Sequence, residues 1–181
     1  AMHIIKERIH TTIQNLQKLS SNDDMINHIS DATQLIISAI KSGNKLMICG
    51  NGGSAADAQH MAGEFVCRFY KYREPLPAIA LTTDTSILTA VPNDYSYDHV
   101  FSRQVKAIGR KGDILLGIST SGSSKNVLEA FKTARQMEIK TILLTSQNEK
   151  EIVQFSDIVI KTPSTDTPRI QEMHLLIEHI S

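Results

Sequence analysis

The sequence predicts an α/β fold, a three-layer α/β/α sandwich in which helices cover both faces of a mainly parallel sheet. Short, continuously apolar runs recur along the chain, each ends in Gly, Ser, Thr or Asp, and helical segments follow several of them. Strands of a parallel sheet are buried on both faces, so they read as continuous apolar runs and not as alternating ones. The runs are KLMICG, PAIAL, DILLGIS, KTILLT and DIVIKT.

Two helices are expected before the first strand, from about Ile4 to Ile40. Apolar residues recur there at helical spacing on both sides of the segment SSNDD. Asn22 or Asp23 is the expected N-cap of the second helix, because a side-chain oxygen at that position accepts a backbone N–H that the helix leaves unpaired. The run KLMICG and a glycine-rich turn then lead into AADAQHMAGEFVCRF, which again has helical spacing. This order is that of a strand, a phosphate-type loop and a helix.

Further along the chain, helices are expected at Asn126 to Met137 and at Ile170 to Ile180. No repeat, low-complexity tract or linker interrupts the pattern, so we expect one domain over residues 1–181. The 41% of hydrophobic residues suffices for one sizeable core. Ligands of open parallel sheets bind beyond the carboxyl ends of the strands. The loops to search therefore follow Cys49, Leu81, Ile118, Leu144 and Ile160.

The charge balance and the cysteines bear on location and partners. Lys and Arg number 19, Asp and Glu number 19, and the formal net charge is +0, so no net field gathers nucleic acid or anionic lipid. The 2 cysteines, Cys49 and Cys67, have no CxxC spacing and are typical of free thiols in a reducing compartment. The segment AMHIIKERIH lacks the apolar stretch of a signal peptide, and no apolar run approaches the roughly 18 residues of a membrane span. We expect a cytoplasmic protein whose partners include neither nucleic acid nor a membrane.

The segment ISTSGSSK, from Ile118 to Lys125, is the first candidate for ligand binding. Its hydroxyls, its flexible glycine and the helix predicted after it suit an anion, so the loop can be a phosphate cradle without arginine. An ordinary serine-rich N-cap and turn has the same composition, and only the position after a core strand favours the cradle. The hydroxyls belong to Ser119, Thr120, Ser121, Ser123 and Ser124.

The segment GNGGSAAD, from Gly50 to Asp57, is a second candidate loop. It has three glycines and no lysine after them, so it is neither a Walker A loop nor a complete dinucleotide fingerprint. It fits a ligand loop, and it fits equally a strand-to-helix turn that needs a positive φ. Another polar cluster is compatible with sugar recognition or with a solvated loop, and comprises Thr82, Thr83, Thr85, Ser86, Asn93 and Asp94.

Two predicted helices carry candidate acid–base or metal-binding side chains. His60 and Glu64 lie four residues apart on one helix face, either as a shared ligand or metal site or, as spacing alone favours, as a solvated pair. The last helix, RIQEMHLLIEHIS, offers His174 and His179, and helical spacing cannot choose between them. Gln171 and His179 are separated by about 12 Å of helix rise, so joint action requires long reach or helices from different chains.

Four segments together resemble the sugar isomerase (SIS) domain family, and specifically its phosphoheptose isomerase branch. The likeness runs in order from about Ile36 to the C-terminus. It implies a flavodoxin-like SIS fold with a five-stranded parallel sheet, with N-terminal helices at about 4–40 and the SIS core at about 36–181. It also implies a homotetramer with active sites at subunit interfaces. The segments are CGNGGSAADAQHMAGEF, LTTDTSILTAVPNDYSYDHVFSRQV, GDILLGISTSGSSKNVLEA and RIQEMHLLIEH.

The activity that the resemblance implies is conversion of D-sedoheptulose 7-phosphate to D-glycero-D-manno-heptose 7-phosphate, an aldose–ketose isomerisation through an enediol. The product would feed nucleotide-activated heptose for bacterial lipopolysaccharide or capsule. The reaction removes a proton from C1 and returns one to C2, so it needs a carboxylate base, which we expect to be Glu64. Proton movement between O1 and O2 suits a histidine near neutral pH, which we expect to be His179.

Carried over residue by residue, the resemblance also assigns ligand contacts. Relatives that bind zinc use a His and a Glu on the first site helix and a Gln and a His on the last, so one Zn²⁺ per site is expected at His60, Glu64, Gln171 and His179. The ion would act as a Lewis acid on the carbonyl. The resemblance thus selects His179 over His174. Phosphate contacts fall on Ser119, Thr120, Ser121 and Ser124. Contacts to the rest of the substrate fall on Asn51, Gly52, Gly53, Ser54, Asn93, Asp94 and Gln171.

Two other functions fit parts of the sequence. The segments TTDTS and PND look like those of a non-enzymatic SIS protein that binds the DnaA-type replication initiator, but those relatives lack the carboxylate and histidine present here as Glu64 and His179. A sugar-phosphate-sensing SIS domain of a transcriptional regulator is a third hypothesis, and the residues before the fold are too few for a helix-turn-helix domain. An isomerase is therefore expected.

Overall fold

The computed structural model describes residues 2–68, 70, 72–146 and 150–180, and for Ile180 only the backbone. Two helices precede the first strand, α1 (Met2–Ser20) and α2 (Asp23–Lys41), and Asn22 caps α2 by accepting a hydrogen bond from the Met25 N–H at 3.0 Å. The predicted pair of helices and the predicted N-cap are therefore confirmed.

Five parallel strands form the sheet, in the order β2-β1-β3-β4-β5. This arrangement confirms the predicted α/β fold with a five-stranded parallel sheet. Each strand corresponds to one of the five apolar runs. The strands are β1 (Leu46–Gly50), β2 (Ala78–Ala80), β3 (Ile114–Ile118), β4 (Lys140–Ser146) and β5 (Ile158–Thr162).

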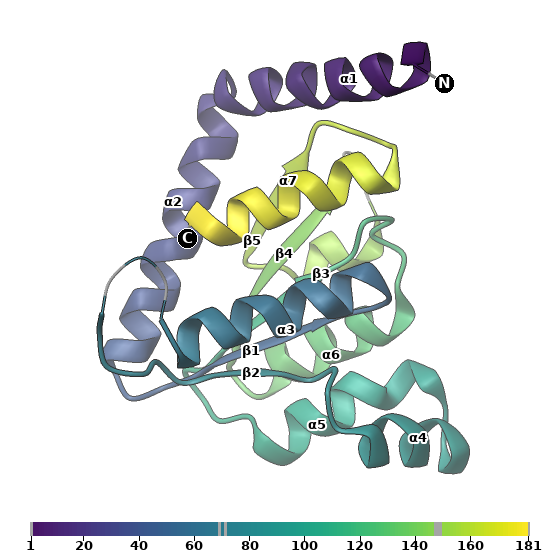
Figure 1. Cartoon of the computed structure of the whole chain (residues 1–181). Helices are drawn as coiled ribbons and strands as arrows, with labels where there is room; N and C mark the ends of the chain where they lie inside the picture. The colour runs from purple at the N-terminus through teal and green to yellow at the C-terminus, as the bar shows by residue number, and fades with distance from the viewer. Residues whose placement is uncertain (1, 69, 71, 147–149, 181) are drawn as a thin grey trace.

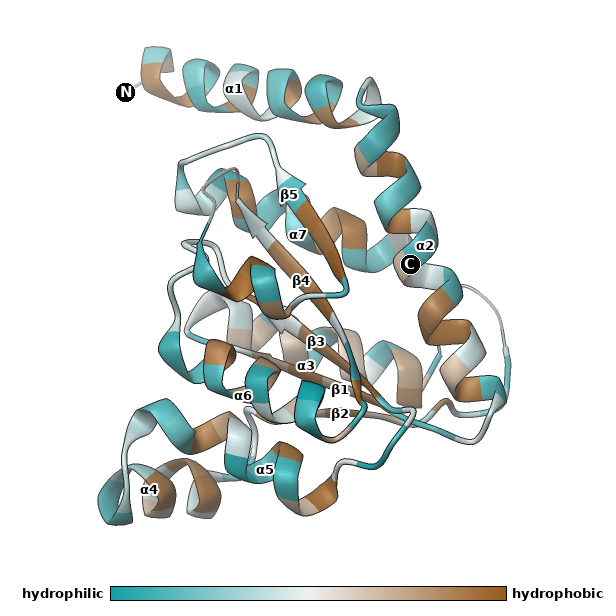
Figure 2. Ribbon diagram, turned by 180° about the vertical axis from the view of Figure 1, so that it is seen from behind, coloured by the Kyte–Doolittle hydropathy of each residue, from teal (hydrophilic) through white to brown (hydrophobic). Residues whose placement is uncertain are grey.

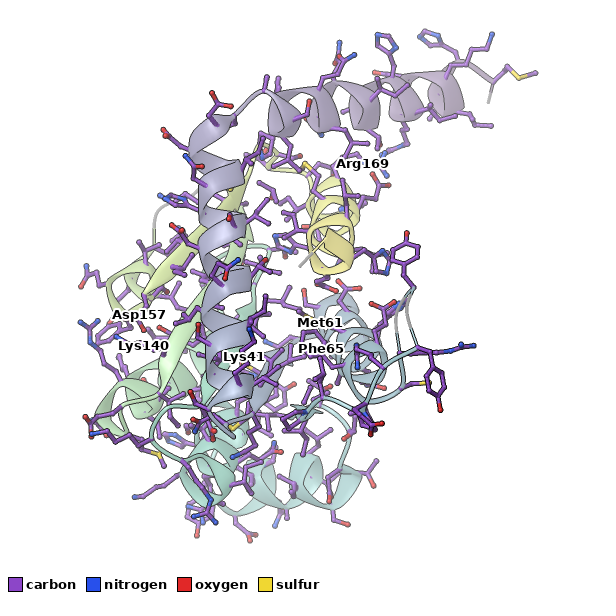
Figure 3. The ribbon with its side chains drawn as sticks, turned by 90° about the vertical axis from the view of Figure 1, so that its left-hand side faces the viewer. Lys41, Met61, Phe65, Lys140, Asp157 and Arg169 are labelled. Carbon is purple, nitrogen blue, oxygen red and sulfur yellow. The ribbon has the colours of Figure 1, made fainter. Side chains whose placement is uncertain are left out.

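Helices cover both faces of the sheet (Figure 1). One face packs against α2, α3 (Gly53–Val66) and α7 (Thr167–Ile180), and the other against α5 (Val100–Ile108), α6 (Lys125–Gln136) and the 3-10 helix η2 (Glu151–Phe155). Successive strand residues alternate between these two cores, so the strands are apolar along most of their length (Figure 2). In Figure 3, Met61 and Phe65 lie on the side of α3 that faces α2 and Lys41.

The strand order reverses direction between β1 and β3. After β1 the chain passes through α3 to β2, which pairs with one edge of β1. Strand β3 pairs with the other edge of β1, and β4 and β5 follow on that side of the sheet. Gly50 and Ile118, the last residues of β1 and β3, are paired neighbours in the register. In open α/β sheets such a switch point opens a crevice beyond the carboxyl ends of the strands. The two candidate loops of the sequence both begin there.

Helix α1 extends from the body of the molecule and lies across the start of α7 (Figure 1). Thr12 of α1 donates a hydrogen bond to Glu172 at 2.9 Å, and Arg169, labelled in Figure 3, pairs with the same Glu172 at 2.6 Å. Four isoleucines of α1 remain 45–57% exposed: Ile4, Ile5, Ile9 and Ile13. A groove of about 510 Å³ lies between the end of α1, α2 and Leu176.

The helices between β2 and β3 were not identified from the sequence. Asp84 caps α4 (Thr85–Asp94), which contains Pro92 and several hydroxyl residues, so its sequence reads as a loop. The 3-10 helix η1 (Tyr97–His99) then leads into α5. Helix α3 ends at Val66, so Cys67, which was predicted to be helical, is its C-cap, and Phe69 lies outside the described residues.

Among the described residues, no helix combines the length and the apolar character that crossing a bilayer requires.

Candidate active site

The loop between β1 and α3 forms one wall of the switch-point crevice. Gly52 has a φ of +58°, a conformation that residues with a Cβ rarely adopt, which explains a glycine there. A Cβ on Gly53 would collide with the side-chain amide of Gln171, so the start of α3 and the start of α7 are in contact. Ser54 is buried in the first turn of α3. The structure thus brings Gln171 to the glycine loop.

The loop Ser119–Ser124 forms the facing wall, between β3 and α6. Ser124 occupies the N-cap position of α6, but its hydroxyl makes no capping hydrogen bond and lies 2.9 Å from the Ser119 hydroxyl. The Ser121 hydroxyl accepts hydrogen bonds from the Ser123 N–H at 3.2 Å and the Ser123 hydroxyl at 2.9 Å. Four of the five hydroxyls, those of Ser119, Ser121, Ser123 and Ser124, therefore bond one another within the loop. The Ser124 hydroxyl does not make the capping hydrogen bond that the competing N-cap interpretation requires.

The third predicted segment, Asn93 and Asp94, lies at the exposed end of α4. The Asn93 amide donates to the Asp94 carboxylate at 2.8 Å. Tyr97, three residues after Asp94, donates its hydroxyl to Asn51 Oδ1 at 3.1 Å. This contact links the α4 segment to the glycine loop.

Three side chains converge where α3 and α7 meet near their C-terminal ends. Glu64 Oε1 lies 2.8 Å from His60 Nε2 and 3.2 Å from His179 Nε2, and the two imidazole nitrogens are 3.4 Å apart. All three ligand atoms lie within 4.8 Å of one another. Glu64 and His179 line a cavity of about 320 Å³, together with Phe65, Glu178 and residues of α2. Two imidazoles and a carboxylate in this arrangement can hold a metal ion or exchange protons.

Two further carboxyl groups lie behind this group. Burial, followed by the nearby Asp57 and Glu64, raises the pKa of Glu178 to about 8, and neither oxygen of Glu178 has a hydrogen-bond partner among the described residues. Burial also raises the pKa of Asp57, an effect that His60 partly offsets. Glu178 therefore lies close to both Glu64 and Asp57, behind the two imidazoles.

The structure separates His174 from His179. His174 is fully buried, and its Nε2 lies 3.0 Å from the carbonyl oxygen of Thr145, to which it donates. Burial lowers the pKa of His174 to about 4, so the ring is neutral near pH 7. His174 packs in the core, whereas His179 faces Glu64.

The predicted residues fall into two groups that lie at opposite ends of α3. Gln171 lies beside Gly53 and His179 beside Glu64, so α3 and α7 run side by side in the same direction. Gly53 and Glu64 are separated by about 16 Å of helix rise, and Gln171 and His179 by about 12 Å. Within one chain, Gln171 and the two loops are therefore at one end, and the group of His60, Glu64 and His179 is at the other.

Sequence reasoning did not single out several polar residues of these walls. Asn126 is 3% exposed and exchanges hydrogen bonds with the side-chain amide of Asn51. The Tyr97 hydroxyl donates to the amide oxygen of Asn51. The Thr145 hydroxyl is buried under the second loop, 3.1 Å from where a Cβ on Gly122 would lie. One signal for Asn126 was available in the sequence: an asparagine in the first turn of a helix commonly bonds to nearby backbone groups.

Comparison with known proteins gives consistent results. The family model described as "SIS domain" matches residues 9–146. A phosphoheptose isomerase of Aliarcobacter butzleri is 55% identical over 151 residues, covering 83% of this chain and 80% of that protein. Phosphoheptose isomerase 2 of Campylobacter jejuni is 51% identical over 176 residues, covering 97% and 88%. The solved structure of a phosphoheptose isomerase from Neisseria gonorrhoeae superimposes with a TM-score of 0.93 at 41% identity, covering 99% of this chain and 95% of that one.

Proposed function

This chain belongs to the SIS domain family, in its phosphoheptose isomerase branch, and we propose that Glu64 and His179 carry its aldose–ketose isomerisation. The observation that carries the proposal is the position of Glu64 Oε1, 3.2 Å from His179 Nε2 and 2.8 Å from His60 Nε2. The substrate is D-sedoheptulose 7-phosphate and the product D-glycero-D-manno-heptose 7-phosphate, a precursor of nucleotide-activated heptose for lipopolysaccharide or capsule.

The proposed roles follow from the chemistry of the enediol route. Glu64 takes the proton from C1 of the ketose and later gives one to C2, while His179 moves a proton between O1 and O2. A carboxylate and an imidazole in direct contact can divide these proton transfers between them.

The donor set of this group fits a zinc ion. Two imidazole nitrogens and one carboxylate oxygen converge, the number of protein ligands that catalytic zinc sites use together with one open position. His60, Glu64 and His179 would hold the ion, with Gln171 of a neighbouring copy as a further ligand. When bound, the ion would supply Lewis acidity toward the substrate oxygens.

We propose further that each complete site combines two copies of the chain. The loops that carry the phosphate and sugar contacts lie at one end of α3, and the acid–base group lies at the other. The apolar face of α1, with the groove beside it, offers a surface for association of copies. A homotetramer with sites at subunit interfaces accounts for both features. A cytoplasmic location is part of the same proposal, in keeping with the free cysteines Cys49 and Cys67.

One loop provides the phosphate site in this proposal. Ser119, Thr120, Ser121 and Ser124 hold the phosphate with the N-terminus of α6, while Asn51, Gly52, Gly53, Ser54, Asn93, Asp94 and Gln171 contact the rest of the substrate. The relatives named above are isomerases, and both Glu64 and His179 are present, so nothing favours the non-enzymatic initiator-binding alternative.

The activity is tested with purified protein and sedoheptulose 7-phosphate. Glu64→Gln keeps the shape of the side chain and removes the base, so we expect turnover to fall by about 10²-fold or more while the phosphosugar still binds. Glu138→Gln, which removes an exposed carboxylate paired with Lys111 away from both loops and the acid–base group, is the control and should retain activity. Full turnover by Glu64→Gln would refute the assignment of the base.

Sharing of the site between copies is tested by mixing two impaired variants and measuring turnover at a substrate concentration well below KM. Glu64→Gln lacks the base, and the double variant Ser121→Ala, Ser124→Ala lacks phosphate contacts. Co-expressed, they can form interfaces that join an intact loop to an intact acid–base group, so part of the activity should return. A mixture confirmed to contain hetero-oligomers that stays inactive would show that each site lies within one chain.

A further inference from the structure

The amides of Asn51 and Asn126 form a reciprocal pair at the switch point between β1 and β3. Asn51 Nδ2 donates to Asn126 Oδ1 at 2.9 Å, and Asn126 Nδ2 donates to Asn51 Oδ1 at 2.8 Å. Asn51 belongs to the glycine loop, and Asn126 lies in the first turn of α6. The pair therefore joins the glycine loop to the helix that follows the hydroxyl-rich loop.

The orientation of both amides follows from a donor that cannot change its role. The backbone N–H of Val127 donates to Asn126 Oδ1 at 2.9 Å. A flipped Asn126 would face this N–H with its own NH₂ group, so the oxygen must lie there and the NH₂ must face Asn51. The Tyr97 hydroxyl donates to Asn51 Oδ1 from the other side, at 3.1 Å. Asn51 is held by two elements at once.

The hydrogen bonds to Asn126 and Tyr97 leave one N–H of the Asn51 side chain for a ligand. Its Oδ1 accepts from both Asn126 and Tyr97, which uses the two lone pairs of the oxygen. One N–H of its Nδ2 is used on Asn126. The second N–H of Nδ2 has no partner among the described residues, so Asn51 can donate it to a ligand. A ligand group that binds there must be an acceptor, such as a phosphate, carbonyl or hydroxyl oxygen.

We propose that Asn126 and Tyr97 are positioning residues that hold Asn51 as a hydrogen-bond donor to an oxygen of the bound sugar phosphate. The proposal rests on the proposed function, which supplies the sugar phosphate as ligand. Tyr97 follows α4, which carries Asn93 and Asp94. The network thus ties together the three segments that line the switch point, and sets which substrate groups the first of them recognises.

The test measures binding of sedoheptulose 7-phosphate by calorimetry in a Glu64→Gln background, in which turnover is expected to be slower by about 10²-fold or more. Asn126→Asp keeps the shape but turns an oxygen toward Asn51 Oδ1, so the pair breaks and Kd should rise about tenfold, the value of one hydrogen bond. Asn51→Asp removes the donor itself and should raise Kd at least as much. Tyr97→Phe should raise it about threefold.

A matched control lies two residues from Tyr97. Tyr95→Phe removes a hydroxyl in the same segment, where the ring packs on Arg103 at 4.0 Å, and should leave Kd unchanged. Tyr97 is half exposed, so Tyr97→Phe keeps the proposal testable even if Asn126→Asp proves unstable. Unchanged Kd in Tyr97→Phe or in Asn51→Asp, or an equal rise in Tyr95→Phe, would overturn the proposal.

The outcome separates this inference from the proposed function. Wild-type protein that binds the phosphosugar without converting it would refute the function and leave the comparison of Kd values intact. Normal turnover by the wild type, with Kd insensitive to Asn126 and Tyr97, would refute the inference alone.

Discussion

Acidification from pH 7 to pH 4 is expected to weaken the folded state through His174. The ring is fully buried, and burial lowers its pKa from 6.5 to about 4. In this range the unfolded chain binds a proton that the folded chain does not, so the contribution is fully present above pH 6.5 and is lost as the pH falls toward 4. The pKa difference corresponds to roughly 3 kcal/mol of unfolding free energy.

The assay is urea unfolding at a series of pH values and one fixed protein concentration. His174→Gln retains a donor that can reach the Thr145 carbonyl but does not titrate, so the wild type should lose about 3 kcal/mol relative to this variant between pH 7 and pH 4. His3→Gln, on the exposed face of α1, should show the same pH profile as the wild type. Parallel profiles for wild type and His174→Gln would refute the argument.

Two further predictions concern the site loops. Ser121→Ala combined with Ser124→Ala should raise KM for sedoheptulose 7-phosphate at least tenfold, because two hydroxyl donors are lost, and an unchanged KM in steady-state assays would contradict the phosphate assignment. Gly53→Ala should unfold at a lower temperature than wild type and bind the phosphosugar less tightly, because the new Cβ displaces Gln171. Gly63→Ala, whose Cβ would lie in open space on α3, should gain about 0.5–1 kcal/mol of unfolding free energy. Equal stability of the two variants in thermal unfolding would contradict this packing argument.

Local sequence patterns were sufficient to predict those elements that depend mainly on one kind of interaction, such as burial or helix capping. The buried strands are continuous apolar runs because both faces pack against helices, and Asn22 was recognisable as an N-cap because capping depends on adjacent residues. Helix α4 was missed because its threonines, serine and Pro92 have weak helix propensity, and it is packed against η1 and α5 by tertiary contacts. Helix propensity therefore does not predict a helix whose stability comes mainly from packing against other elements.

The amino-acid sequence was enough to predict the α/β fold, the two loops at the switch point and the family to which the chain is similar. These follow from apolar periodicity, glycine and hydroxyl composition and motif order, all of which are local in the chain. Helical spacing does not show which face of the last helix meets the core, and only the resemblance selected His179; the structure buries His174 and places His179 beside Glu64. It also divided Gln171 from Glu64 and His179 and paired Asn51 with Asn126. Those contacts join residues far apart in sequence, so their partners are fixed by how the helices and loops pack around the sheet.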